Sequence, residues 1–201
     1  MQVKDAIFNR RAIKHFDAEH KMTAAEEKEL LETTIQAPTS FNIQHWRFVI
    51  LRDPELRAKI RKDFGNDQPQ MTDASLLVLF TADMKAWQKE PSRYFANAPK
   101  EVAEMLVNWM GPFHEGREWL QRDEAQRSIG LTMQTMMLAA QGMGYQSCPM
   151  IGFDIEEVAK LINLPDDHVM GPMVAIGKGT KEAWPKPGQL TLDEVTVDNG
   201  F

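Results

Sequence analysis

The sequence predicts a single domain that mixes α-helices with short β-strands, and three observations predict this class. Thr23 and Glu26 have the spacing of a capping box at the start of a helix. Residues 123–144 carry apolar side chains alternately four and three positions apart, the period of a helix with a buried face. Residues 76–80 are a short apolar run, typical of a strand buried on both faces. We treat residues 1–201 as one domain, because a chain of this length buries about 70% of its unfolded surface.

The N-terminal part is expected to contain two helices and an irregular loop. Residues 3–9 form a short helix that leads into a basic run. The helix that opens at the capping box extends to about Gln36 and is ended by Pro38, because proline disfavours helical geometry in the residue before it. Residues 37–42 are therefore expected to be a polar loop.

Three strands are expected along the chain. Residues 46–51 have the aromatic and β-branched content of a strand, and Asp53 followed by Pro54 then starts a helix with proline in its first turn. Residues 76–80 supply the second strand and residues 173–176 supply the third. Residues 87–119 carry no pattern that assigns them to an element.

The helix of residues 123–144 carries two apolar lines. The first predicts a buried stripe and consists of Ile129, Met133, Met136, Ala140 and Met143. The second contains Leu131 and Leu138, and Gly130 beside it would permit close approach of another element. We therefore expect this helix to be covered on two sides, as at the centre of a fold or at an interface.

The C-terminal part is expected to be a helix followed by an extended tail. Asp154 and Glu157 cap the helix, which extends to about Ile162. From Lys178 onward the chain is rich in Pro, Gly and charge. Residues 191–197 could supply a strand, but a lone strand would expose an edge that needs a partner.

Composition narrows the possible partners. The chain has 23 Lys+Arg and 29 Asp+Glu, a formal net charge of -6, so no global positive field attracts nucleic acid or an anionic membrane. Cys148 is the single cysteine, which rules out an intramolecular disulfide and favours a reducing compartment. The first 20 residues lack the apolar block of a secretory signal. We expect a cytoplasmic protein without membrane or nucleic-acid partners.

Three segments carry residue types suited to binding a small ligand. Arg10, Arg11 and Lys14 could hold a phosphate dianion, although a solvated basic turn is the ordinary alternative. Residues 38–46 combine hydroxyls, amides and aromatic rings that could satisfy a polar heterocycle, or could merely bond their own backbone. Residues 148–152 follow a glycine-containing helix end, so their N–H groups could face a flat ligand; an ordinary turn is the alternative.

Other common sites find no support in the sequence. The histidines show no metal-ligand spacing, so we expect no metal; they are His15, His20, His45, His114 and His168. No glycine-rich dinucleotide or phosphate-loop motif is present. Cys148 is expected to be a small buried hydrophobe, because no flanking residue supplies a cation that would activate it.

Together these segments resemble the FMN-dependent nitroreductase family. Residues 10–16 (RRAIKHF) are similar to its N-terminal basic motif, and residues 37–46 (APTSFNIQHW) to its Ala-Pro-Ser-Ser-x-Asn-x-Gln-Pro-Trp motif. The resemblance continues through residues 68–70 (QPQ), 149–154 (PMIGFD) and 177–179 (GKG). It implies an α+β fold with a central, mainly antiparallel sheet flanked by helices. It also implies an interlocked homodimer that binds FMN between its subunits.

The resemblance implies a cofactor-binding set and a role for each part of it. The set is Arg10, Arg11, Ala12, Lys14, Pro38, Thr39, Ser40, Asn42, Gln68, Gln70, Pro149, Met150, Ile151, Gly152 and Lys186. The cations would hold the phosphate and reach the ribityl or pyrimidine end. Residues 38–42 would come from the second subunit, and a tail of about 185–201 would wrap across it. The N–H of Ile151 or Gly152 would face flavin N5, and one of the two glutamines would meet the pyrimidine edge.

The implied reaction transfers hydride from NADH or NADPH through FMN to a small organic acceptor such as a nitroaromatic or a quinone, in ping-pong order. No side chain need act as acid, base or nucleophile, because the cofactor carries the chemistry. Ala12 replaces a frequent Ser, His45 replaces a common Pro, and the tail lacks a second basic residue after Lys186. Phosphate binding should be weakened, although Arg11 could compensate. A flavin-storage or sensor protein of the same fold, and a helical interaction protein, are the alternative hypotheses.

Overall fold

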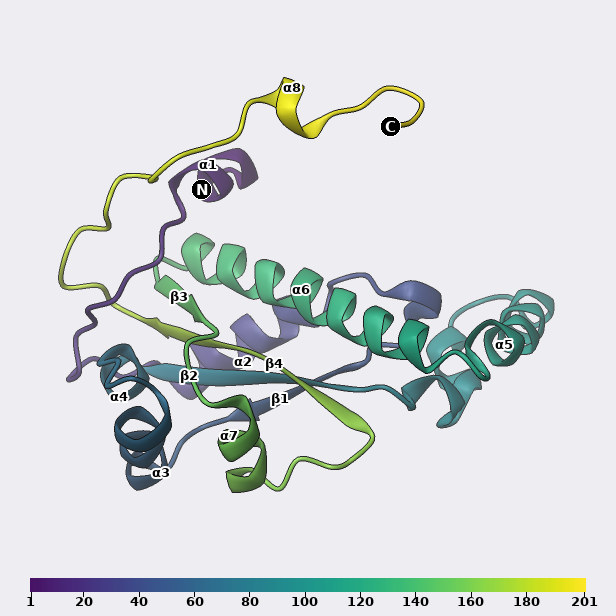
Figure 1. Cartoon of the computed structure of the whole chain (residues 1–201), viewed down its shortest axis with the longest axis horizontal. Coiled ribbons are helices and arrows are strands. Elements are labelled where there is room, and N and C mark those ends of the chain that lie inside the picture. Colours follow the sequence, from purple (N-terminus) through teal and green to yellow (C-terminus); the bar gives the residue numbers. More distant parts are fainter.

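A four-stranded antiparallel sheet forms the centre of the computed structural model, which describes residues 1–201 (Figure 1). Its strands are β1 (Trp46–Ile50), β2 (Leu76–Asp83), β3 (Gln146–Met150) and β4 (His168–Gly177), and their spatial order is β1-β2-β4-β3. All neighbouring strands pair in antiparallel fashion. The α+β class with a mainly antiparallel sheet is therefore confirmed.

The two central strands are apolar on both faces. Residues 76–80 are buried, as expected from the sequence, and the strand continues to Asp83 with all eight of its residues buried. Val78 pairs with Val174 and Leu79 with Met173, so successive pairs alternate between the two faces of the sheet. Leu79 and Met173 join one hydrophobic cluster, whereas Val78 and Val174 join a second. The sheet thus separates two cores and requires helices on both sides.

One face of the sheet is covered by α6 (Glu118–Gly142) and α2 (Ala24–Thr34), as Figure 1 shows. The predicted stripe of α6 faces this core, where Ile129, Met136 and Ala140 are buried. Leu131 remains 47% exposed, so the second apolar line is only partly covered within one chain. The helix begins at Glu118, five residues before the expected start, and Leu120 in this added turn is also buried.

The other face is covered by α3 (Pro54–Lys59), α4 (Gln70–Asp73) and α7 (Ile155–Leu161). The predicted caps are present: Asp53 accepts a hydrogen bond from the N–H of Glu55 at 2.9 Å, and Asp154 accepts one from Glu157 at 3.0 Å. A π-helical segment (Ile60–Phe64) continues α3 toward α4. This places the loop of residues 65–69 near the end of β3.

At the N-terminal end of α6 lies a small helical unit that the sequence did not assign. It contains α5 (Lys100–His114) and the 3-10 turns Ala86–Gln88 and Pro91–Phe95 (Figure 1). A third cluster of Ile43, Ala86, Tyr94 and Met110 holds this unit to the loop before β1, where Ser40–Asn42 form another 3-10 turn.

Two expectations for the C-terminal half are wrong. Residues 148–150, expected to belong to a turn after the long helix, instead lie in the edge strand β3, which tolerates Pro149 because an edge strand leaves some N–H groups unpaired. The tail residues expected as a strand instead contain the one-turn helix α8 (Leu192–Val195). The N–H of Thr191 donates to the Glu194 carboxylate at 2.8 Å, which favours this turn. The remaining element is α1 (Val3–Asn9), as predicted.

No helix combines the length and the apolar character that a membrane crossing requires.

Candidate functional site

The basic segment runs beside the edge strand β3 and pairs with it at one point. The N–H of Ile13 donates to the Ser147 carbonyl at 3.0 Å, and Ala12 forms a parallel bridge with the same residue. Farther on, the N–H of Thr180 donates to the His15 carbonyl at 3.0 Å. Ile13 and the following Phe16 are buried and anchor the segment. The neighbouring charged side chains are consequently held at the edge of the sheet.

Arg10 and Arg11 are used differently within the chain. Nη1 of Arg11 donates to the carbonyls of Phe8 at 2.7 Å and of Arg10 at 2.9 Å. Nη1 of Arg10 is buried and has no hydrogen-bond partner. A buried guanidinium nitrogen without an acceptor is costly, and an anionic oxygen would satisfy it. Arg10 therefore fits a phosphate, whereas the expected compensating role of Arg11 conflicts with its existing backbone bonds.

Cys148 lies close to two of these cations. Burial raises the pKa of the Cys148 thiol, and the nearby Lys14 and Arg10 offset only part of that rise. No residue that flanks Cys148 in the sequence supplies a cation, but the fold brings Lys14 and Arg10 near it from a distant segment. The conclusion that Cys148 is a buried thiol is confirmed by its 3% exposure.

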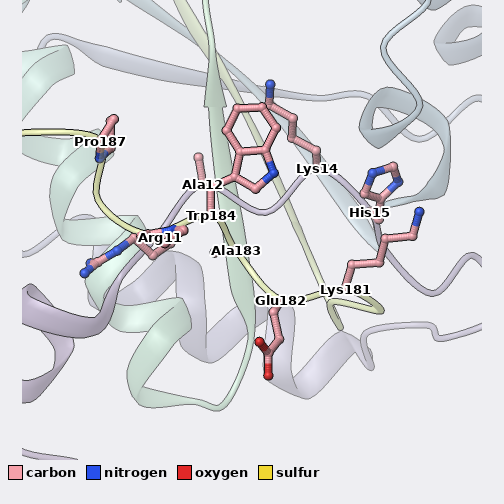
Figure 2. A pocket seen from close by; sticks show the side chains of 10 residues that line it. Arg11, Ala12, Lys14, His15, Lys181, Glu182, Ala183, Trp184 and Pro187 are labelled. Carbon is pink, nitrogen blue, oxygen red and sulfur yellow. The ribbon is translucent and has the colours of Figure 1, made fainter.

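A cavity of about 250 Å³ separates the basic segment from the tail (Figure 2). Its wall is formed by Arg11, Ala12, Lys14, His15, Lys181, Glu182, Ala183, Trp184, Pro185 and Pro187. Nζ of Lys14 lies 5.8 Å from the centroid of the Trp184 indole. Lys186, which the sequence placed in the site, is not part of this wall. Lys181 and Trp184 were missed, although a tryptophan three residues after Lys181 and two before Lys186, in a proline-rich tail, was a signal that could have found them.

The turn after β3 meets the two predicted glutamines. Nε2 of Gln68 donates to the Gly152 carbonyl at 2.8 Å, and Nε2 of Gln70 donates to Oε1 of Gln68 at 2.9 Å. Gln70 is only 2% exposed, so Gln68 is the glutamine at the surface of the turn. Asn66, which the sequence analysis missed, also donates to the Gly152 carbonyl at 3.2 Å.

The same turn leaves backbone donors free. The N–H of Phe153 donates to the Ile151 carbonyl at 2.9 Å, which bends the chain tightly. The N–H groups of Ile151 and Gly152 make no hydrogen bond within the chain, and both residues are exposed. Pro149 and Met150 belong to β3, and Met150 is buried beneath the turn. Two adjacent N–H donors are thus available to an acceptor atom.

The polar loop is held away from these groups. Asn42 donates its side-chain amide to the Tyr94 carbonyl at 2.8 Å, and the Thr39 hydroxyl accepts from the N–H of Gln44 at 2.9 Å. The Ser40 hydroxyl is buried without a partner, and Pro38 is exposed at the start of the loop. Some polar groups of the loop thus form hydrogen bonds within the chain, as the alternative interpretation of its sequence expected. The Ser40 hydroxyl does not.

The polar loop and the basic segment lie toward opposite ends of α6. His45, directly after the loop, is hydrogen-bonded to Ser128 at 2.9 Å, whereas the basic segment pairs with Ser147, beyond the end of the helix. The rise of an α-helix from Ser128 to Gly142 is on the order of 20 Å. One chain therefore cannot bring both segments to the same small ligand.

Two buried histidines support the polar loop. Burial and the nearby His114 lower the pKa of His45 to about 4, and burial lowers the pKa of His114. Both rings are fully buried, and Nε2 of each has no partner. The His114 ring stacks on Trp87 with centroids 5.4 Å apart. These rings are neutral at pH 7 and serve as packing groups behind the loop.

A separate group of acidic and histidine side chains gathers where β2 meets β4. Ligand atoms of Asp83, Asp167 and His168 lie within 4.8 Å of one another. Nζ of Lys89 sits 2.8 Å from a carboxylate oxygen of each aspartate. The ammonium group supplies the positive charge there, so this group forms an ion-pair network.

Comparison with solved structures shows the same fold in several bacterial proteins. YdfN of Bacillus subtilis matches with a TM-score of 0.88 and 29% identity, over 96% of this chain and 97% of that one. A structure from Exiguobacterium sibiricum, solved in complex with FMN, matches with a TM-score of 0.89 and 23% identity over 98% and 97%. The class defined by this fold and site is that of the α+β nitroreductases.

Sequence comparison gives the family. The model of the Nitroreductase family matches residues 7–178, and the chain belongs to that family. Protein DrgA of Synechocystis sp. is 58% identical over 200 residues, covering 97% of this chain and 95% of DrgA. MhqN of Bacillus subtilis is 32% identical, covering 87% of each chain. The resemblance found in the sequence motifs is confirmed.

Proposed function

We propose that this chain is a cytoplasmic, homodimeric oxidoreductase that binds FMN and passes hydride from NADH or NADPH to a small organic acceptor such as a nitroaromatic or a quinone. The observation that carries this proposal is the buried, unpartnered Nη1 of Arg10 at one end of β3, with the free N–H groups of Ile151 and Gly152 beyond the other end. Ser147 and Ile151 are four residues apart, about 13 Å along a strand. This arrangement suits a ligand with an anionic group at one end and a flat heterocycle at the other.

The residues of the chain would each act by binding or orienting. Arg10 and Lys14, with Lys186 from the tail, would neutralise the phosphate and stabilise negative charge on the ring. The Gly152 turn would direct a backbone N–H at an acceptor atom of the ring, and Gln68 would hold that turn in place. When bound, FMN supplies the two-electron chemistry through N5. No side chain is assigned proton transfer.

A second copy of the chain would complete the site. Residues Pro38, Thr39, Ser40 and Asn42 lie too far from Arg10 in one chain, so they would reach the flavin from the partner. Exposed apolar side chains favour such a partner: Val3 is 72% exposed and Phe8 is 67% exposed on α1, and Leu131 is 47% exposed on α6. A dimer that buries these surfaces would also cover the extended tail.

The decisive experiment is anaerobic reduction followed by reoxidation. Purified protein reconstituted with FMN should lose its yellow colour on addition of NADH or NADPH. Menadione or a nitroaromatic should restore the colour at least as fast as steady-state turnover. Absence of flavin binding would refute the proposal. Flavin that binds and is reduced, but is not reoxidised by any acceptor, would instead identify a storage or sensor protein.

A further inference from the structure

A second buried polar atom without a partner lies at the same edge of the sheet as the Arg10 guanidinium. It is Oγ of Ser147, on β3. Ser147 is only 2% exposed, and its hydroxyl makes no hydrogen bond within the chain. A buried hydroxyl without a partner is as costly as a lost hydrogen bond. The proposed flavin site gives this hydroxyl no role, so its retention in the fold calls for an acceptor from outside the chain.

The register of β3 fixes the direction of the Ser147 side chain. Cys148 belongs to the first hydrophobic cluster, and side chains alternate along a strand, so Ser147 and Pro149 face the opposite side of the sheet. Their partners on β4 are Ile176 and Val174, which both belong to the second cluster. Ser147 therefore shares a face with Pro149, which is a residue of the proposed flavin site.

The basic segment directs a small side chain to the same face. Ala12 forms a parallel bridge with Ser147, and bridged residues point to the same side of a sheet, one strand spacing of about 4.8 Å apart. Ile13, the next residue, is buried in the first cluster with Cys148, which agrees with this direction. Ala12 is exposed, and its methyl group can neither donate nor accept a hydrogen bond. The face therefore offers one hydroxyl here, that of Ser147.

Positive charge surrounds this position. Burial raises the pKa of the Cys148 thiol, and Lys14 and Arg10 offset part of that rise, so both cations lie close to the residue that follows Ser147. Ser147 is also four residues before Ile151, about 13 Å along the chain, and so lies at the end of β3 opposite the free N–H groups of the turn. The hydroxyl therefore belongs to the anionic end of the proposed ligand.

We propose that the Ser147 hydroxyl donates a hydrogen bond to the phosphate of FMN, a contact that Ala12 on the facing segment cannot make. This inference rests on the proposed function, because it adds a binding residue to the same site. One phosphate dianion satisfies both buried donors, the Ser147 hydroxyl and Nη1 of Arg10, through charge-assisted hydrogen bonds. Ser147 touches the phosphate and not the reacting ring.

The first test compares FMN with riboflavin, which has the same ring and ribityl chain but no phosphate. Ser147→Ala should weaken FMN binding about tenfold in a fluorescence titration, through loss of one hydrogen bond to a charged group. It should leave the Kd for riboflavin unchanged. The matched control Ser92→Ala removes an exposed serine hydroxyl outside the site and should bind both ligands as the parent does.

The second test moves the hydroxyl across to the facing segment. In the double variant Ser147→Ala with Ala12→Ser, the new hydroxyl is one strand spacing from the lost one. The Kd for FMN should return to within about threefold of the parent value, because the two positions share one phosphate and their effects are not additive. Rescue of this kind distinguishes a missing hydroxyl from damage to the packing around β3.

The third test measures the apoprotein and the bound phosphate separately. Ser147→Ala should leave the free energy of unfolding of the apoprotein unchanged or raise it, because the variant removes an unpartnered buried group. With FMN bound at saturation, phosphorus NMR should show a displaced phosphate resonance, whereas the flavin absorption spectrum should match that of the parent.

Four results would overturn the inference. They are parental FMN affinity in Ser147→Ala, equal weakening of FMN and riboflavin, a double variant that binds FMN no better than Ser147→Ala, and an apoprotein destabilised by Ser147→Ala. The second would place the hydroxyl at the ring, and the fourth would show that it already has a partner. Failure of the proposed function is distinguishable, because the parent would then bind neither FMN nor riboflavin.

Discussion

Arg10 provides the sharpest test of the flavin site, because its role predicts effects of opposite sign with and without the ligand. Nη1 of Arg10 is buried and unpartnered, so an unliganded chain carries an uncompensated polar group. Replacing it in Arg10→Met should leave the free energy of unfolding of the apoprotein unchanged or should raise it. The same change should weaken FMN binding, because the phosphate loses a charge-assisted hydrogen bond.

The magnitude follows from one such bond. A hydrogen bond to a charged group contributes about 1.5–3 kcal/mol, which corresponds to a loss of roughly 10-fold to 150-fold in affinity for FMN. At an FMN concentration of about 100 Kd the ligand stabilises the parent by about 2.7 kcal/mol. A tenfold weaker variant at the same concentration retains about 1.4 kcal/mol. The difference of about 1.3 kcal/mol should lower the FMN-bound Tm by about 3–5 °C for a domain of this size.

The assay is thermal unfolding with and without FMN, together with a flavin-fluorescence titration for Kd. Arg11→Met is the matched control, because the Arg11 guanidinium already donates to the carbonyls of Phe8 and Arg10. Its Kd for FMN should stay within about threefold of the parent value. Equal FMN-induced Tm shifts in the parent and in Arg10→Met would refute the assignment of this guanidinium to the phosphate.

Three further predictions concern the turn, the buried histidine and the interface. Gln68→Ala removes the 2.8 Å hydrogen bond to the Gly152 carbonyl; it should lower the free energy of unfolding by about 1 kcal/mol in urea titration and slow flavin reduction in stopped-flow measurements. If the reduction rate is unchanged, the turn does not depend on Gln68. Because the pKa of His45 falls from 6.5 to about 4 on folding, the unfolded chain takes up more protons, and about 3 kcal/mol of stability should be lost as pH falls from 6.5 to 4. In His45→Gln this fall in the free energy of unfolding between pH 6.5 and 4 should disappear. If the fall persists, it arises from other titrating groups. Leu131→Asp charges a half-exposed apolar position of α6 and should give a monomer by light scattering, with FMN binding weakened at least tenfold; a flavin-loaded monomer of parental affinity would contradict the shared site.

The helices and strands with strong local signals were predictable from the sequence. The capping box at Thr23, the helix start at Asp53 and the buried strand of residues 76–80 all agree with the structure. β3 was missed because its residues, which include Pro149, have weak strand propensity and owe their conformation to pairing with β4. α5 was missed although its apolar residues recur at helical spacing, because Gly111 and Pro112 near its end are residues that usually interrupt a helix.

The candidate site likewise has features that the sequence predicted and features that it did not. The motifs around Arg10, Asn42 and Gly152 could be found from residue types and order, because cations, amides and glycine carry distinct chemistry. The sequence could not show which guanidinium is free or which glutamine is buried, because adjacent residues of the same type differ only in how the folded backbone directs and buries their side chains. Gln70 is buried against Gln68, and Arg11 is used by the backbone of α1 and its C-cap.

By itself, the sequence determined the family, the α+β class and the chemical character of the three ligand-binding segments, since these are carried by local composition and spacing. Only the tertiary structure decided that Lys181 and Trp184 face Lys14 across a cavity, and that the polar loop lies toward the opposite end of α6 from the basic segment. The physical reason is that local propensities act over a few residues, whereas packing on a shared sheet fixes the distance between segments that are far apart in the chain.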